Sequence, residues 1–156
     1  CRNYRYALWR IWDKEKPLVM FIGLNPSTAN ESENDPTIKS VCRIAKSNGY
    51  GGVYMMNCFS FVSTDPIALN NYDKSVYDQQ QFINNNRRLK AIGDICTDVV
   101  FAWGNFRIVL ETGRDKDLIK MFPNAKCIAQ NKNGSPKHPL YCKSDSKFIP
   151  YLTQYK

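Results

Sequence analysis

Three short apolar runs, each of which ends on or directly before glycine or asparagine, constrain the fold of this chain more than any other feature. They cover residues 18–22, 52–57 and 99–104. Apolar runs of this length without polar alternation are typical of strands buried on both faces. Between the first two runs, residues 35–48 repeat apolar positions at helical spacing. Strands that alternate with helices indicate a parallel sheet covered on both faces.

The predicted fold class is therefore α/β, a three-layer sandwich in which helices flank a central, mostly parallel four-stranded sheet. A run at 126–129 supplies the fourth strand, and aromatic residues that alternate with arginines at 4–12 predict an extra N-terminal strand. Residues 79–95 and 106–121 are expected to hold helices, and the tail from Ser146 is expected to form a final helix. The 156 residues, 43% of them apolar, are expected to form one domain, 1–156.

Positive charge gathers in the second half of the chain. Residues 1–86 hold 9 Lys and Arg against 8 Asp and Glu, whereas residues 87–156 hold 13 against 6. Almost all of the net charge of +8 therefore lies beyond residue 86. Such one-sided basicity favours a polyanionic partner, and nucleic acid or nucleotide is expected, although a merely basic protein has the same composition.

The cysteines are expected to be free thiols and not metal ligands. The chain has six cysteines, no Cys-x-x-Cys pair and one histidine, so neither a zinc site nor an iron–sulfur site is expected, and no cofactor is expected. Buried free thiols in a reducing cytoplasm are the favoured interpretation. No apolar run is long enough to span a membrane and no leader is evident, so a cytoplasmic monomer without membrane contact is expected.

Residues able to do chemistry stand where the predicted strands end. Asn25 follows the first strand, Asn57 closes the second, Gly104 closes the third, and His138 lies in a loop beyond the fourth. The carboxyl ends of parallel strands share one edge, where open α/β folds bind ligands, so these four positions are expected to converge on one cleft. An amide there can position water or a base, but it can also simply hold a turn.

Four segments, in order along the chain, resemble the motifs of the uracil-DNA glycosylase superfamily. Gly-Leu-Asn-Pro-Ser at 23–27 is similar to its Gly-x-(Asp/Asn)-Pro motif, in the form found in the mismatch-specific thymine/uracil branch. Residues 54–57 resemble the strand whose terminal Asn reads the base edge, and 100–104 resemble a Leu-Leu-Trp-Gly strand. His-Pro-Leu at 138–140 resembles the loop that grips the DNA minor groove.

The chain as a whole resembles the microbial and phage family called domain of unknown function 1643. The matching segments are 4–6, 25–29, 35–37, 102–104 and 138–141.

The glycosylase resemblance implies roles for individual residues. Asn25 would orient the attacking water, His138 would donate a hydrogen bond to a base carbonyl or contact phosphate, and Asp35 would be either the missing general base or only a helix cap. The substrate-binding set is Gly23, Leu24, Pro26, Ser27, Asn57, Phe59 and Trp103. For Trp103, a place in the core is the favoured interpretation. The DNA-binding set is Lys132, Lys137, Pro139, Leu140 and Lys143.

Two departures from the superfamily pattern sharpen the expectation. Uracil-specific members place Tyr after the motif proline, where it blocks bases with a C5 substituent, whereas this chain has the small Ser27. The resemblance therefore implies a pocket open to 5-substituted pyrimidines. The loop that begins at His138 lacks the Ser-Pro of the superfamily, which makes Leu140 a less certain wedge.

The predicted function is a metal-independent DNA N-glycosylase that excises a modified or mismatched base, in phage defence or DNA repair, from a bacterial, archaeal or phage source. Its partner would be duplex DNA with a flipped base, or single-stranded DNA. Two alternatives remain open at this point: an N-glycosidase acting on free nucleotides or nucleosides, and a non-catalytic binder of modified nucleic acid.

Overall fold

The computed structural model describes residues 8–24, 36–59 and 79–153 and contains one six-stranded mixed sheet. The strand order is β1-β3-β2-β4-β5-β6. Strands β3, β2, β4 and β5 run parallel to their neighbours, while β1 pairs antiparallel with β3 and β6 pairs antiparallel with β5. The strands are Leu8–Ile11, Leu18–Gly23, Gly52–Asn57, Asp98–Phe101, Lys126–Cys127 and Ile149–Pro150.

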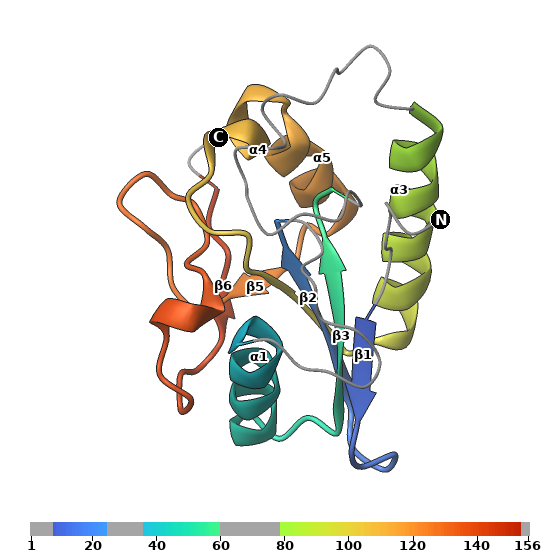
Figure 1. The fold of residues 1–156 in the computed structure, drawn as a ribbon, viewed down its shortest axis with the longest axis vertical. Helices are drawn as coiled ribbons and strands as arrows, with labels where there is room; N and C mark the ends of the chain where they lie inside the picture. Colours follow the sequence, from blue (N-terminus) through green and yellow to red (C-terminus); the bar gives the residue numbers. More distant parts are fainter. Residues whose placement is uncertain (1–7, 25–35, 60–78, 154–156) are drawn as a thin grey trace.

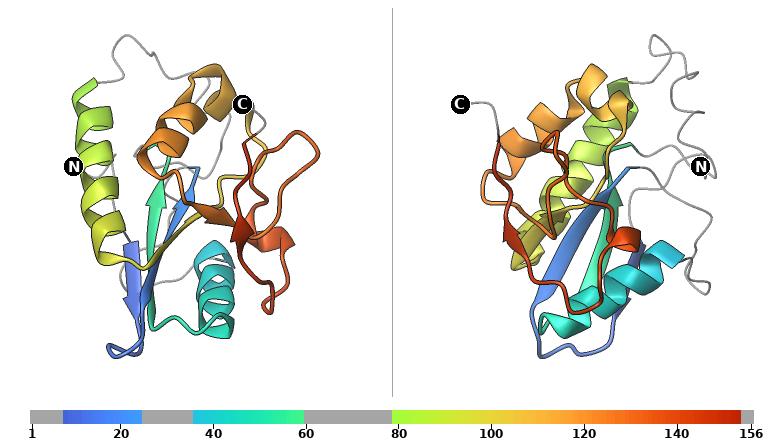
Figure 2. Two further views of the ribbon diagram at one scale, coloured as in Figure 1. Left: turned by 180° about the vertical axis from the view of Figure 1, so that it is seen from behind. Right: turned by 90° about the vertical axis from the view of Figure 1, so that its left-hand side faces the viewer.

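Helices cover both faces of this sheet (Figure 1). Helix α1, Pro36–Ser47, lies on one face, and helices α3, α4 and α5 lie on the other, as Figure 2 shows from two further sides. Helix α3 spans Gln79–Ile95, α4 spans Arg107–Glu111 and α5 spans Arg114–Met121. A short 3₁₀ helix, η1 at Pro139–Tyr141, contacts α1. The α/β class and the helices on both faces agree with the sequence-based expectation.

Strand β2 shows why the sheet has two cores. Val19 and Phe21 pack with the residues of α1, whereas Met20 and Ile22 pack with α3, α4 and α5, and all four side chains are fully buried. Successive side chains of a strand point to opposite faces. An unbroken apolar run therefore contributes side chains to the hydrophobic cores on both faces of the sheet. The prediction that the run is buried on both faces is therefore confirmed.

The expected helix after Ser146 is wrong, because this segment contains the edge strand β6, Ile149–Pro150. Proline lacks the N–H that a helix interior needs and is tolerated on an edge strand. Phe148 packs against Phe21 in one core, and Tyr151 packs against Phe101 in the other. Opposed packing of nearby residues suits an extended chain rather than a helix.

The expected helix at 106–121 is divided in two. Gly113 adopts a φ of 71°, and it separates α4 from α5. A left-handed residue ends an α-helix and lets the next one start in a new direction, and glycine adopts that conformation at no steric cost. This break places Arg114 and Asp115 at the start of α5, where both are buried.

Candidate functional site

The carboxyl ends of β2, β3 and β4 form one edge, as the parallel sheet predicts. Gly23 and Asn57 are register partners, and the pairing continues where the amide of Cys58 donates to the carbonyl of Gly23 over 2.8 Å. On the other side of β2, the amide of Ala102 donates to the carbonyl of Ile22, also over 2.8 Å. The described ends of the first three motif segments therefore lie side by side.

Asn57 ends β3 at this edge, with its side chain next to Gly23. The residue is 6% exposed. A Cβ atom built on Gly23 would lie 3.1 Å from Oδ1 of Asn57 and 2.6 Å from Cε of Met55. The absence of a side chain at position 23 therefore makes room for the amide, which can both donate and accept hydrogen bonds.

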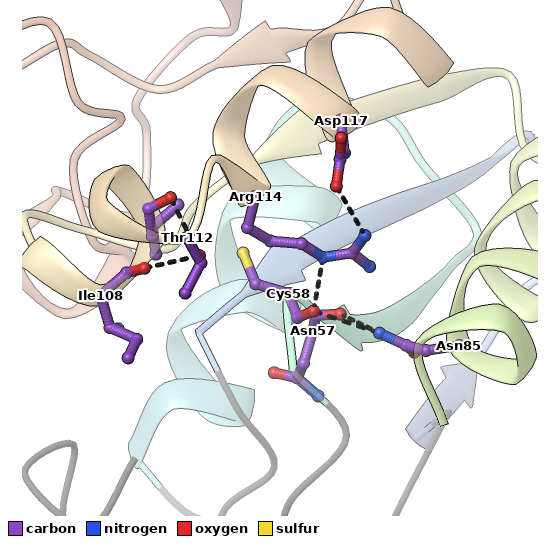
Figure 3. A network of polar contacts seen from close by, with 8 residues as sticks. Asn57, Cys58, Asn85, Ile108, Thr112, Arg114 and Asp117 are labelled. Atoms are coloured by element: carbon purple, nitrogen blue, oxygen red, sulfur yellow. Dashed lines mark hydrogen bonds and ion pairs between the residues drawn. The ribbon is translucent and has the colours of Figure 1, made fainter. Parts of the chain in front are cut away.

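Two buried side chains hold the backbone behind Asn57 (Figure 3). Nδ2 of Asn85, on α3, lies 3.0 Å from the carbonyl oxygen of Asn57 and 3.3 Å from that of Cys58. Nε of Arg114, on α5, donates to the Cys58 carbonyl over 2.8 Å. In Figure 3 the amide of Asn57 points away from both of these donors. Helices α3 and α5 thus fix the strand end and leave the side chain to face the edge.

Arg114 is an unusual residue to find in a core. It is 1% exposed, and its Nη1 atom lies 3.8 Å from Oδ2 of Asp117. Burial raises the pKa of the neighbouring Cys58 thiol, and the Arg114 guanidinium lowers it by a smaller amount. The Cys58 thiol is therefore neutral at physiological pH and acts as a small apolar group.

Sequence reasoning missed Asn85 and Arg114. A signal for Arg114 was present, because it stands one helical turn before Leu118 on the buried side of α5. A charged residue in the apolar row of a helix marks a buried polar contact.

His138 lies between the bridge that pairs Gln130 with Pro136 and the 3₁₀ helix η1. Its Nδ1 atom accepts a hydrogen bond from the amide of Leu140 over 3.2 Å and caps the 3₁₀ helix. Its ring meets the ring of Tyr141 edge-on, with 6.0 Å between centroids. Because Nδ1 is the acceptor, the neutral imidazole carries its proton on Nε2, the atom that can donate.

The loop of His138 is attached to the end of β4. The amide of Gly104 donates to the carbonyl of Pro136 over 3.0 Å. A Cβ atom built on Gly104 would lie 3.4 Å from Cβ of His138. The structure therefore places Gly23, Asn57 and Gly104 at the carboxyl ends of neighbouring strands, with His138 beside Gly104. That the four positions line one cleft stays a prediction.

The predicted DNA-binding residues have mixed environments. Pro139 is buried, Lys137 is half-buried, and Lys132, Leu140 and Lys143 are exposed, with Leu140 44% exposed. Lys132 belongs to a hairpin closed by the bridge between Gln130 and Pro136. A partner could therefore contact two basic side chains and one apolar side chain: Lys132, Lys143 and Leu140.

Trp103 and Phe59 lie in the core, next to the edge rather than on it. Trp103 is 2% exposed, and its ring packs 4.6 Å from that of Phe101. Phe59 is buried in the same cluster, as is Leu24, whose carbonyl accepts from the Phe59 amide. This is the core environment that the sequence favoured for Trp103. Four predicted site residues, Asn25, Pro26, Ser27 and Asp35, lie outside the described residues.

The described ranges lack the features of a metal site and of a membrane-spanning helix. Within them, no three His, Cys, Asp or Glu residues come together as a metal site would require. No helix in the same ranges has the length and apolarity to cross a membrane. The five cysteines in these ranges are free thiols, and Cys58 and Cys127 are buried.

The protein has an α/β fold whose parallel strands end together at one edge, the position at which open α/β folds bind ligands. The family described as "Protein of unknown function (DUF1643)" matches residues 5–140, and the chain therefore belongs to that family. This confirms the resemblance expected for the whole chain. No curated protein and no solved structure matches it.

Proposed function

We propose that this chain is a DNA N-glycosylase that removes a modified or mismatched base, with a 5-substituted pyrimidine as the expected target. The observation that carries the proposal is the position of the Asn57 amide in front of Gly23, on the same side of the sheet as Gly104 and His138. These residues come from the four segments that resemble the glycosylase motifs. The basic second half of the chain supports a DNA partner.

The proposed reaction is hydrolysis at C1′ of the deoxyribose. The bond between C1′ and the base nitrogen breaks, and its electron pair leaves with the base. The oxygen of water bonds to C1′, and its proton is finally taken up by the departing base. The transition state has positive charge on the sugar and negative charge on the base, and polar groups fixed in advance stabilise both.

Each of the proposed site residues suits one part of this reaction. Asn25 would hold the water, and since an amide cannot accept its proton, a slow reaction or a reactive substrate follows. Asn57 would pair with the mixed donor and acceptor edge of the base. The Nε2–H of His138 would donate to a carbonyl of the leaving base. Asp35 would assist as a base if it stands near Asn25.

A base must leave the duplex before this reaction, which costs a few kcal/mol. Contacts from exposed Lys132 and Lys143 to phosphates would offset that cost. Ser27, which stands in place of a blocking tyrosine, supports a target larger than uracil.

The decisive experiment incubates the protein with oligonucleotides that each carry one base: uracil, thymine opposite guanine, 5-hydroxymethyluracil or a glucosylated cytosine. Abasic sites are detected by alkaline cleavage. We expect release of a modified or mismatched base by the native protein and none by Asn25→Ala, with Lys39→Ala on α1 as an exposed control. Failure to release any base from duplex or single strands would overturn the proposal.

The same samples separate the two alternatives. Release of base only from free nucleosides would favour a nucleoside N-glycosidase. Tight, salt-sensitive binding with every oligonucleotide intact would indicate a non-catalytic binder.

A further inference from the structure

Tyr141 is the most exposed of the large apolar and aromatic side chains that the structure describes. It is 76% exposed, whereas the nearby aromatic side chains of Phe148 and Tyr151 pack against the two cores. An aromatic ring in water leaves a large apolar surface unburied. Single exposed rings are common on proteins, so the surroundings of this ring decide whether it has a function.

The turn that carries Tyr141 is held firmly. The amide of Tyr141 donates to the carbonyl of His138, and the amide of Cys142 donates to the carbonyl of Pro139, each over 3.1 Å. Nδ1 of His138 accepts from the amide of Leu140, and Pro139 is buried. A fixed backbone therefore presents the ring, and less conformational freedom is lost when a partner binds to it.

Positive charge gathers around this turn. The segment from Lys137 to Lys147 contains three lysines and one acidic residue, Asp145. Burial raises the pKa of the Cys142 thiol and Lys137 lowers it by a smaller amount, which places the Lys137 ammonium group near the end of η1. Lys143 follows Cys142 and is exposed. A polyanion suits this surface, whereas an apolar protein surface would have to desolvate the charges.

An aromatic ring among positive charges matches the chemistry of an unpaired nucleotide. Proteins that bind single strands stack bases on aromatic side chains and hold the phosphates with basic groups. Inside a duplex, neighbouring bases cover the faces of each base, and only base edges and phosphates are open to a protein. Tyr141 therefore finds a base face in a single strand and none in an intact duplex.

We propose that the turn of η1 binds single-stranded DNA, with an unpaired base stacked on the Tyr141 ring and a neighbouring phosphate bound by Lys143. The choice of DNA rests on the function proposed above, for which duplex and single-stranded DNA were both open as partners. The Tyr141 and His138 rings lie 6.0 Å apart between centroids. The stacked base is therefore close in the strand to the base that His138 would contact.

Fluorescence anisotropy with labelled oligo(dT), and with its duplex with oligo(dA), tests the stacking contact. The native chain should bind the single strand more tightly than the duplex. Tyr141→Ala should weaken single-strand binding at least about fivefold, the lower limit for the loss of one stacked base, and leave duplex binding unchanged. Tyr141→Phe keeps the ring and should bind as the native chain does. Ile95→Ala is the control, because it removes an exposed apolar side chain from the end of α3 and should change neither affinity.

Salt dependence separates the ring from the charge. Tyr141→Ala removes no charge and should leave the slope of log affinity against log salt unchanged. Lys143→Gln should lower this slope by about 0.7, the value for one phosphate contact with a single strand. Tighter binding of the duplex by the native chain, unchanged single-strand affinity in Tyr141→Ala, or an equal loss in Tyr141→Phe would overturn the proposal.

NMR on the native chain locates the contact without any variant. Oligo(dT) should shift the amide signals of Leu140, Tyr141 and Cys142, and shifts confined to other elements would equally overturn the proposal. Both measurements use unmodified DNA and record no base release. Absence of glycosylase activity therefore leaves the stacking contact standing, and loss of the stacking contact leaves base release to be decided by its own assay.

Discussion

At the scale of single residues, the proposed site depends on the absence of a side chain at Gly23. Gly23 faces Asn57 across two paired strands, and its missing side chain leaves the space in which the amide lies. The small residue therefore acts through its neighbour rather than through any contact of its own. Its effect on base recognition can be separated from its effect on folding.

Gly23→Ala is expected to lower the rate of base release at least tenfold. The new Cβ would lie 3.1 Å from Oδ1 of Asn57 and force the amide to move, whereas the Met55 methyl group at 2.6 Å can rotate away. Such overpacking costs about 1–3 kcal/mol of stability, which urea unfolding would measure. Gly93→Ala is the matched control, because its Cβ would meet the Phe122 ring at 2.7 Å, away from this edge. Comparable losses of activity in both variants would contradict the role given to Gly23.

At the scale of elements, the site depends on two helices that carry no predicted site residue. Asn85 on α3 and Arg114 on α5 bond the carbonyl groups at the end of β3. Both are positioning residues, since they act through Asn57. The stability of this strand end is therefore shared by helices that are distant in sequence.

Asn85→Ala is expected to lower the free energy of unfolding by about 1–3 kcal/mol, because buried carbonyl groups lose a donor. We expect it also to lower the rate of base release at saturating DNA, since Asn57 would lose its fixed backbone. Asn86→Ala is the control from the same helix, because Oδ1 of Asn86 has no hydrogen-bond partner in the described part of the chain. If Asn85→Ala releases base as fast as Asn86→Ala, Asn85 supports the fold only.

The elements were predictable from sequence where apolar periodicity is strong. The apolar runs of β2, β3 and β4 directly indicate which residues are buried. The helical spacing of apolar residues in α1 does the same. Strand β6 was not predictable, because two residues that include Pro150 carry no periodic signal and pair only once the core exists. The hydrogen bonds from Asn85 to the Asn57 carbonyl and from Arg114 to the Cys58 carbonyl likewise arise from tertiary packing. The edge that gathers Gly23, Asn57 and Gly104 was predictable, because parallel strands end together.

At the scale of the whole molecule, the two edges of the sheet differ. At the amino-terminal edge, the Tyr50 hydroxyl donates to Asp98, and Lys126 lies 3.1 Å from the same carboxylate. These contacts join Tyr50, just before β3, to the first residues of β4 and β5. The opposite edge presents Asn57 and the loop of His138.

Binding to DNA should depend strongly on salt. Replacing Lys132 and Lys143 by glutamine should lower the slope of log affinity against log salt by about 0.9 for each lost phosphate contact in duplex DNA. Fluorescence anisotropy between 50 and 200 mM salt, about the range over which such contacts weaken, measures this slope. Replacing Lys39 and Lys46 on α1 is the control, and an equal change in both variants would argue against a specific DNA-binding face.

Stability should fall as the pH rises above about 9, because buried thiols are neutral in the fold. Burial raises the pKa of Cys127 to about 11 and that of Cys96 to about 12. Unfolded thiols ionise near a pKa of about 8.5, so over this range the unfolded chain binds fewer protons and gains stability. Urea unfolding between pH 7.5 and 10.5 measures the decline. Cys127→Ala should show a shallower decline than the native chain, and an identical decline would exclude Cys127 as a source.

Gly113 has a consequence for how this chain can change in evolution. Arg114 and Asp115 follow it directly; the first contacts the end of β3 and the second lines a pocket beside the end of β4. One inserted or deleted residue at this break would turn both side chains by about 100°, since a helix has about 3.6 residues per turn. Substitutions elsewhere on α5 can accumulate one at a time, but a change of length here would remove both contacts together. We therefore expect relatives of this protein to vary in the sequence of α5 while keeping the spacing from Gly113 to Asp115.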